Sequence, residues 1–126
     1  MTATDAHSAG TTDNPRRLAE AYFESWKSRD FDTLRTLLAP GVTFRGPLGK
    51  ANGVDECIVG MQGLAESITD IRILKIAVDD NDVITWYDLY TRDAPPIPTA
   101  NWSHVEDGKI TRIRATFDPR PLLPPA

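Results

Sequence analysis

Hydrophobic and polar positions change their spacing along this chain, from a helical period in its first half to a strand period in its second. From Leu18 to Trp26, apolar residues recur every three or four positions, which predicts a helix with one wide apolar face. Asn14-Pro15 is a favourable start for this helix, because Asn suits the N-cap and Pro suits the first helical position. We therefore expect residues 1–13, which are small and polar, to form a disordered leader.

Two shorter helices are predicted next, with a short strand between them. Asp30 is placed to cap the first of them, which Pro40-Gly41 ends. Val42–Arg45 then favours a strand that stops at Gly46-Pro47, and Val54–Ser67 favours a third helix. The apolar residues expected to face inward from these two helices are Leu34, Leu37, Leu38, Val54, Ile58, Met61 and Leu64 or Ala65.

Four antiparallel strands are predicted in the second half of the chain. Residues 70–78 and 83–91 flank a polar turn, and residues 94–98 are expected to be a loop because consecutive prolines cannot join a ladder. The last two strands, residues 100–106 and 109–117, flank Asp107-Gly108, which is a strong hairpin signal.

This order of elements predicts an α+β fold, in which a curved antiparallel sheet wraps around the long N-terminal helix as a conical barrel with three helices. We expect one domain over residues 14–119 and a Pro-rich tail over residues 120–126. A cone of this kind has an open mouth, which is a common place for a small ligand.

Composition and charge argue against several classes of binding partner. The net charge is -4, and the chain has no basic stripe to neutralise phosphates, so no nucleic-acid partner is expected. No apolar run approaches the length of a membrane span, so no membrane partner is expected and a cytoplasmic location is the default. Cys57 is the only cysteine, and we expect it to be a small buried residue rather than a nucleophile. We expect neither a metal site nor a cofactor, since ligand clusters and phosphate-binding glycine motifs are lacking.

Three segments resemble the nuclear transport factor 2-like superfamily, and within it the SnoaL-like proteins and the ketosteroid isomerases. They are residues 18–34, Val42–Pro47 with the following Gly53, and the hairpin strand from Asp107 to Pro119. The resemblance covers the chain from residue 18 to residue 123. It implies a conical pocket for a small hydrophobic molecule and a homodimer built on the sheet, while activity varies widely among members of the superfamily.

The resemblance also assigns positions of the known active sites. Ketosteroid isomerases use an Asp as general base, with a Tyr and a protonated Asp as the oxyanion hole. Tyr22 matches the tyrosine and Asn101 the protonated Asp, whereas Gly46 falls at the base and cannot carry a proton. Ala115 similarly falls where the limonene-epoxide-hydrolase branch has an Asp. Neither of these two reactions is therefore expected by its familiar route.

Asp88 is the candidate acid–base residue. By the period of two it shares a face with Trp86 and Tyr90, and strands of this superfamily usually place such a Trp inward, which would put Asp88 in the cavity. An apolar cavity would raise the pKa of that carboxyl and make it a proton carrier near neutral pH. The alternative is a solvated residue on the outer face of the sheet.

The remaining candidates hold or surround the ligand. Tyr22 and Asn101 would hold an oxygen that gains charge, or else they are a core tyrosine and a structural amide. His104 faces away from Asn101 and is a surface or interface residue in preference to an acid–base catalyst. The predicted pocket-lining residues are Trp26, Phe44, Trp86, Tyr90, Ser103, Ile113, Ala115 and Phe117. Trp102 and Tyr87, expected on the outer face, favour the homodimer.

The sequence leaves two functions open. One is cofactor-free proton-transfer chemistry of the cyclase, isomerase or dehydratase type on a hydrophobic ring compound. The other is a non-catalytic ligand-binding or dimeric assembly module that has lost its base, as Gly46 suggests. A position of Asp88 on the outer face of the sheet would remove most of the case for catalysis.

Overall fold

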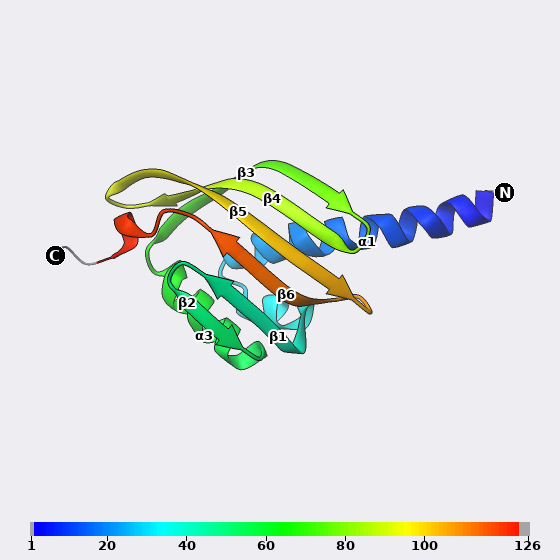
Figure 1. The fold of residues 1–126 in the computed structure, drawn as a ribbon, viewed down its shortest axis with the longest axis horizontal. Helices are drawn as coiled ribbons and strands as arrows, with labels where there is room; N and C mark the ends of the chain where they lie inside the picture. Colours follow the sequence, from blue (N-terminus) through cyan, green and yellow to red (C-terminus); the bar gives the residue numbers. More distant parts are fainter. Residues whose placement is uncertain (1, 124–126) are drawn as a thin grey trace.

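The computed structural model describes the backbone of residues 2–123 and the side chains of residues 14–123 (Figure 1). Within these residues the helices are α1 (Thr2–Lys27), α2 (Phe31–Leu37), α3 (Val54–Ala65) and the short 3-10 helix η1 (Arg120–Leu122). The strands are β1 (Leu38–Gly46), β2 (Gly49–Asn52), β3 (Ile68–Asp79), β4 (Asp82–Thr91), β5 (Ala94–Glu106) and β6 (Lys109–Thr116). The predicted α+β class is confirmed.

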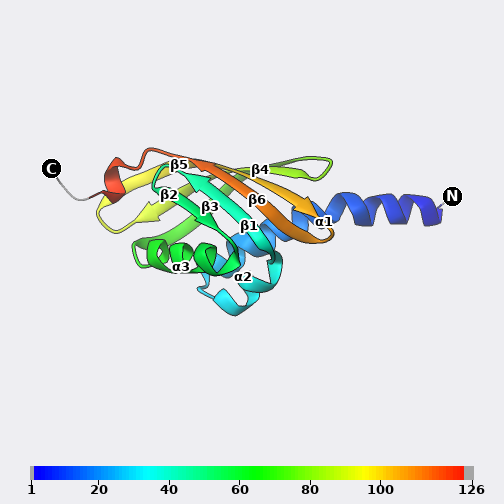
Figure 2. The same cartoon turned by 60° about the horizontal axis from the view of Figure 1, so that its bottom comes forward.

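The strands form one curved, open sheet in the order β2-β1-β6-β5-β4-β3. All neighbouring pairs are antiparallel except β1 and β6, which run parallel, so the sheet is mixed and not purely antiparallel as expected. Figure 2 shows the three α-helices gathered on one side of this sheet. The opposite side has no helix over it among the described residues, and we call it the outer face.

Aromatic side chains of α1 fill the space between the helices and the sheet. Tyr22, Phe23 and Trp26 are buried, and the Phe23 and Tyr87 rings lie with their centroids 4.8 Å apart. Such a pair contributes about 0.5–1.5 kcal/mol beyond the area that it buries. The Trp26 indole donates to the carbonyl of Met61 at 3.1 Å, which fixes α1 against α3. Asp30 caps α2 as expected, because its carboxylate accepts the backbone N–H of Thr33.

The expected loop over residues 94–98 is wrong, because β5 already begins at Ala94. In this stretch β5 pairs only with β4, through Ile97 with Leu89 and Pro98 with Asp88. Pairing with β6 starts at Ala100. The prolines therefore lie where one side of β5 has no neighbouring strand to receive an N–H, which is the edge position that proline tolerates.

Two element boundaries also differ from expectation, and one strand was not expected. Helix α1 begins at Thr2 and continues through Pro15, so it includes the segment expected as a leader, while the side chains of residues 2–13 lie outside the described residues. Leu38 opens β1 and does not belong to α2. Strand β2 was not predicted, and the domain limits at residues 14 and 119 stay predictions. In the part of the chain that is described, no helix has the length and apolarity needed to cross a membrane.

Candidate functional site

A cavity of about 270 Å³ lies between α1, α3 and the β1–β2 hairpin. Its wall is mostly apolar and comes from four parts of the chain. The lining residues are Tyr22, Trp26, Phe44, Gly46, Pro47, Leu48, Gly49, Lys50, Ala51, Glu56, Cys57, Gly60, Met61, Leu64 and Phe117. A small apolar cavity with few polar groups is the usual form of a site for a small organic ligand.

The β1–β2 hairpin contributes a continuous part of this wall. Gly46 pairs with Gly49 at the turn, and Phe44 pairs with Ala51. A Cβ atom at Gly46 would lie only 2.9 Å from Cε1 of the Phe44 ring. The lack of a side chain at Gly46 therefore makes room for the aromatic ring that lines the cavity. Sequence reasoning missed the hairpin because β2 has only four residues, too few to show a period.

Tyr22 is a polar residue of the cavity wall. Burial raises the pKa of Tyr22 well above its usual value, and the nearby Tyr87 and Cys57 raise it further, while a hydrogen bond with the Asn101 side chain acts in the opposite direction. Asn101 is itself buried on β5 and accepts a hydrogen bond from the Ser103 hydroxyl at 2.9 Å. The structure thus brings Tyr22 and Asn101 together, with Ser103 behind them.

Two further polar side chains of α3 line the cavity. Burial raises the pKa of the Cys57 thiol to about 11, so the thiol holds its proton at neutral pH and is not a reactive thiolate. Glu56 is exposed, and its carboxylate accepts the backbone N–H of Asn52 at 2.9 Å. This bond ties the end of β2 to the first turn of α3.

The structure divides the sequence-predicted pocket residues into three groups. Members of the cavity wall are Tyr22, Trp26, Phe44 and Phe117. Buried away from the cavity are Asn101, Ser103 and Ile113, and Ala115 is half-buried outside the wall. On the outer face are Trp86, Asp88 and Tyr90, which were expected inside.

The inward placement of Trp86, Asp88 and Tyr90 is therefore wrong, although their alternation is right. Tyr87 points inward, packs on Phe23 and is 3 % exposed, whereas Trp86 is 46 % exposed. Because both faces of β4 carry an aromatic residue, the alternation leaves the inner face undecided. The packing of α1 decides it. Tyr87 is correspondingly absent from the outer face, where it was expected.

Asp88 lies among charged groups on the outer face. It is paired across the strands with Arg72, whose guanidinium stands 5.0 Å from the centre of the Tyr90 ring. The pKa of Arg72 is raised, mainly by its hydrogen bond with Asp70 and to a smaller extent by the Asp88 charge. Asp88 therefore has no access to the cavity and cannot act on a molecule bound there.

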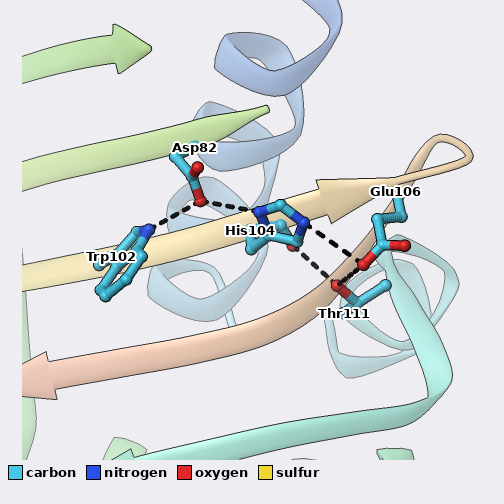
Figure 3. A network of polar contacts seen from close by, with 5 residues as sticks. All are labelled: Asp82, Trp102, His104, Glu106 and Thr111. Atoms are coloured by element: carbon cyan, nitrogen blue, oxygen red, sulfur yellow. Dashed lines mark hydrogen bonds and ion pairs between the residues drawn. The ribbon is translucent and has the colours of Figure 1, made fainter. Parts of the chain in front are cut away.

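His104 belongs to a separate polar network at one end of the outer face (Figure 3). Its Nδ1 lies 2.8 Å from an Asp82 carboxylate oxygen, which also accepts the Trp102 indole N–H at 2.8 Å. Its Nε2 lies 3.3 Å from Glu106, and the Thr111 hydroxyl donates to the His104 carbonyl oxygen. Across the described residues, no cluster of three or more His, Cys, Asp or Glu side chains is arranged to hold a metal ion.

Both the sequence and the fold of this chain are similar to those of known proteins. The sequence profile of a family described as the SnoaL-like domain matches residues 19–113. A solved protein from Kribbella flavida is 30% identical, with a TM-score of 0.80 over 90% of this chain and 91% of its own. A nuclear transport factor 2-like protein of unknown function from Cytophaga hutchinsonii is 26% identical, with a TM-score of 0.74 over 86% of this chain and 93% of its own.

An enzyme of known reaction class shares the fold at lower identity. An LEH-like epoxide hydrolase of M. tuberculosis is 21% identical, with a TM-score of 0.73 over 85% of this chain and 84% of its own. At this identity the likeness concerns the fold alone, because one fold carries many activities. Among proteins with curated functions, none matches the chain significantly.

Proposed function

This chain belongs to the SnoaL-like family, and from that premise we propose that it binds a small hydrophobic ring compound in the cavity between α1, α3 and the β1–β2 hairpin. The observation that carries the proposal is the composition of the wall. Aromatic rings of Trp26, Phe44 and Phe117 and the flexible side chain of Met61 surround the space, and Tyr22 is a further aromatic residue of the wall. Flat apolar rings gain most from such surroundings, since they pack against aromatic rings and leave water.

The chemistry of the wall favours binding over proton abstraction. Tyr22 and Cys57 both have raised pKa values, so each holds its proton and acts as a donor. Glu56 is the carboxylate of the wall, but it is exposed and engaged with the backbone of Asn52. Gly46 supplies no acid or base. Of the two functions that the sequence left open, the non-catalytic ligand-binding module is therefore the one we propose.

Cofactor-free chemistry is the second candidate, and one observation favours it. A protonated Tyr22 beside Asn101 is a donor that can stabilise negative charge developing on an oxygen of a bound molecule. Such chemistry would proceed without Asp88, which faces away from the cavity. The expected outcome is that Asp88→Asn leaves ligand binding and any turnover unchanged. A loss of turnover in that variant would show that Asp88 takes part in the reaction.

We also propose a homodimer formed through the outer face. Trp86 and Trp102 are 46 % and 42 % exposed there, and Ile84, the neighbour of Trp102 across the strands, is 45 % exposed. Such large apolar side chains grouped on one face mark an interaction surface. The resemblance to the superfamily implies a homodimer built on the sheet, which supports a second copy of the chain as the partner. The expected cytoplasmic location stays a prediction.

The binding proposal is tested by filling the cavity. Gly60 lines it from α3, and a Cβ at Gly60 meets no atom within 4 Å, so Gly60→Phe adds a ring to the space without a backbone clash. We expect tetralin, the bicyclic hydrocarbon probe, to bind wild-type protein saturably and to bind Gly60→Phe roughly tenfold more weakly or not at all. Titration calorimetry measures both affinities.

Gly63→Phe is the matched control for this experiment. Gly63 lies on the same helix, has the same open surroundings and does not line the cavity. Its replacement should leave tetralin binding as in the wild type. Equal loss of binding in both variants, or the lack of any saturable binding to the wild type, contradicts the proposal.

A further inference from the structure

Three arginines stand together on the outer face, on the part of the sheet formed by β1 and β6. Arg45 of β1 is paired in register with Arg114 of β6, which is paired in turn with Trp102 of β5. Arg112 precedes Arg114 on the same face, and its guanidinium stands 5.7 Å from the centre of the Trp102 ring. We call Arg45, Arg112 and Arg114 the arginine cluster. Lys50 of β2 is paired with Arg45 and extends this row of cations.

No carboxylate among the described residues neutralises the arginine cluster. Ion pairs join other arginines to acids, such as Arg35 to Asp55, but none of them includes a member of the cluster. The pKa of Asp82 is lowered mainly by the hydrogen bonds that it accepts within the network of Figure 3, and Arg112 contributes less. Like charges directly opposite one another destabilise a sheet. The outer face therefore keeps an unfavourable arrangement of charges that a bound anion would relieve.

Backbone carbonyls orient two of the three guanidinium groups. Nη1 of Arg45 donates to the Phe44 carbonyl at 2.7 Å and to the Ala51 carbonyl at 3.3 Å. Nη1 of Arg114 donates to the Ile113 carbonyl at 2.9 Å. All hydrogen bonds from the Arg114 side chain to described residues use this Nη1, so the edge formed by its Nε and Nη2 faces no protein acceptor. That edge presents two parallel N–H groups, which can hold two oxygens of one anion at once.

We propose that the arginine cluster binds the phosphate group of a small molecule, with the Nε and Nη2 edge of Arg114 holding two oxygens and Arg45 and Arg112 neutralising the charge. A phosphate monoester has a charge of about -1.5 to -2 and three terminal oxygens at neutral pH, so it matches three guanidinium groups better than a carboxylate does. Partial burial lowers the pKa of Arg114, and the charges of Arg45 and Arg112 lower it further, which supports their closeness.

The net charge of the chain favours a small molecule over a nucleic acid. It is -4, so a long polyanion would be repelled beyond the cluster, whereas a single phosphate group meets the cluster alone. The pairing of strands assembles the cluster, which is why no basic run announces it in the sequence. The site lies on the outer face and does not depend on the function proposed for the cavity.

The test is NMR of the arginine Nε–H groups during titration of the wild-type protein with methyl phosphate at constant ionic strength. The signal of Arg114 should shift and saturate, while that of Arg35, which is paired with Asp55, should stay in place. Acetate, which has the same methyl group and a single charge, should bind roughly tenfold more weakly. Lack of a saturable shift at Arg114 overturns the inference, and so does acetate that binds as tightly as methyl phosphate.

Matched variants separate a built site from general attraction between charges. Arg114→Gln should weaken the binding of methyl phosphate roughly tenfold or more, the change expected for a charge-assisted hydrogen bond. Arg114→Lys keeps the charge without the two parallel N–H groups, so it should also bind more weakly than the wild type. Arg35→Gln removes the same charge from α2 and should bind as the wild type does. Wild-type affinity in Arg114→Lys, or equal losses in Arg114→Gln and Arg35→Gln, would indicate diffuse attraction and overturn the inference.

Three further measurements complete the test. Arg112→Gln changes an exposed residue, so it tests the cluster if Arg114→Gln does not fold, and unchanged affinity in it contradicts the inference. Trp86→Gln weakens the proposed dimer contact without adding a charge and should bind methyl phosphate normally, because one copy of the chain supplies the whole cluster. Loss of binding in that variant overturns a site formed by one copy. A short oligothymidylate should bind no more tightly than methyl phosphate, and tighter binding that Arg114→Gln abolishes would replace the small molecule by a nucleic acid.

Discussion

At the scale of single residues, the middle of the inner sheet face holds polar side chains where a closed core would hold apolar ones. Thr85 on β4 lies opposite Asn101 on β5, and Thr99 and Ser103 flank Asn101 on the same face. Ser103 bonds to Asn101, and Thr99 donates to the Ile97 carbonyl at 3.0 Å. The Thr85 hydroxyl is buried and finds no partner among the described residues.

We expect the replacement of Thr85 to change the free energy of unfolding. Thr85→Val keeps the shape of the side chain and removes an unpartnered hydroxyl, so we expect the free energy of unfolding to rise by about 1 kcal/mol. Thr99→Val, in which the lost hydroxyl had a partner, should lower it by about as much. Urea unfolding of the two variants beside the wild type measures both changes. A Thr85→Val protein as destabilised as Thr99→Val would show that the Thr85 hydroxyl is satisfied.

The residues also show how far the sequence determines the site. The resemblance identified Tyr22, and the alternation along β5 placed Asn101 and Ser103 on one face and Trp102 on the other, as observed. Asp88 was expected on the wrong face because β4 carries apolar residues on both of its faces. Its pattern therefore does not show which face is buried. The packing of α1 against Tyr87, a contact between distant parts of the chain, decides the direction.

At the scale of elements, the polar network of Figure 3 joins β4 and β5 at the end of the outer face. Hydrogen bonds from Trp102 and from His104 hold the pKa of Asp82 below its usual value. A carboxyl whose pKa is lowered by folding stabilises the folded state above its unfolded pKa, and this contribution is lost as the pH falls through the folded pKa.

We therefore expect Asp82 to contribute to the loss of stability at acid pH. Wild-type protein should lose stability as the pH falls below about 4, the ordinary pKa of an aspartate. Asp82→Asn should be less stable at neutral pH and should lose less over the acid range. Asp93→Asn, which changes an exposed carboxyl in the turn between β4 and β5, is the control and should keep the wild-type dependence. Thermal unfolding from pH 3 to pH 7 provides the measurement, and parallel curves for all three proteins would contradict the prediction.

Elements with a strong local signal were predicted, and elements that depend on distant pairing were not. The Asp30 cap and the Asp107-Gly108 turn rest on local chemistry, and both are present. Strand β2 exists because Gly46 and Gly49 allow a tight return to β1, and the first part of β5 exists because β4 pairs with it on one side. Neither of these strand pairings produces a periodic pattern of apolar residues in the sequence.

At the scale of the whole molecule, the resemblance seen in the sequence is confirmed by the family profile and by the solved neighbours. The fold supplies two faces with separate roles. Helices cover the inner face and enclose the cavity, while the outer face presents Ile84, Trp86 and Trp102. Arg112 stands 5.7 Å from the Trp102 ring and covers it only in part.

The proposed homodimer forms through the outer face and can be tested by sedimentation. We expect the wild type to sediment as a dimer at micromolar concentration, because association removes its exposed tryptophans from water. Trp86→Lys should shift the protein to the monomer, since a charge buried without a partner is costly. Val59→Lys places the same charge on α3, away from the outer face, and should remain dimeric. A monomeric wild type at this concentration would refute the dimer.

The proposed function requires that the ligand binds in the cavity and not on the outer face. The direct measurement is methyl NMR of the wild-type protein during titration with tetralin. Signals of Met61 and Leu64, which line the cavity, should shift together and saturate, while the signal of Ile84 on the outer face stays in place. Shifts at Ile84 with none at Met61 and Leu64, or no saturable shift at all, would contradict binding in the cavity.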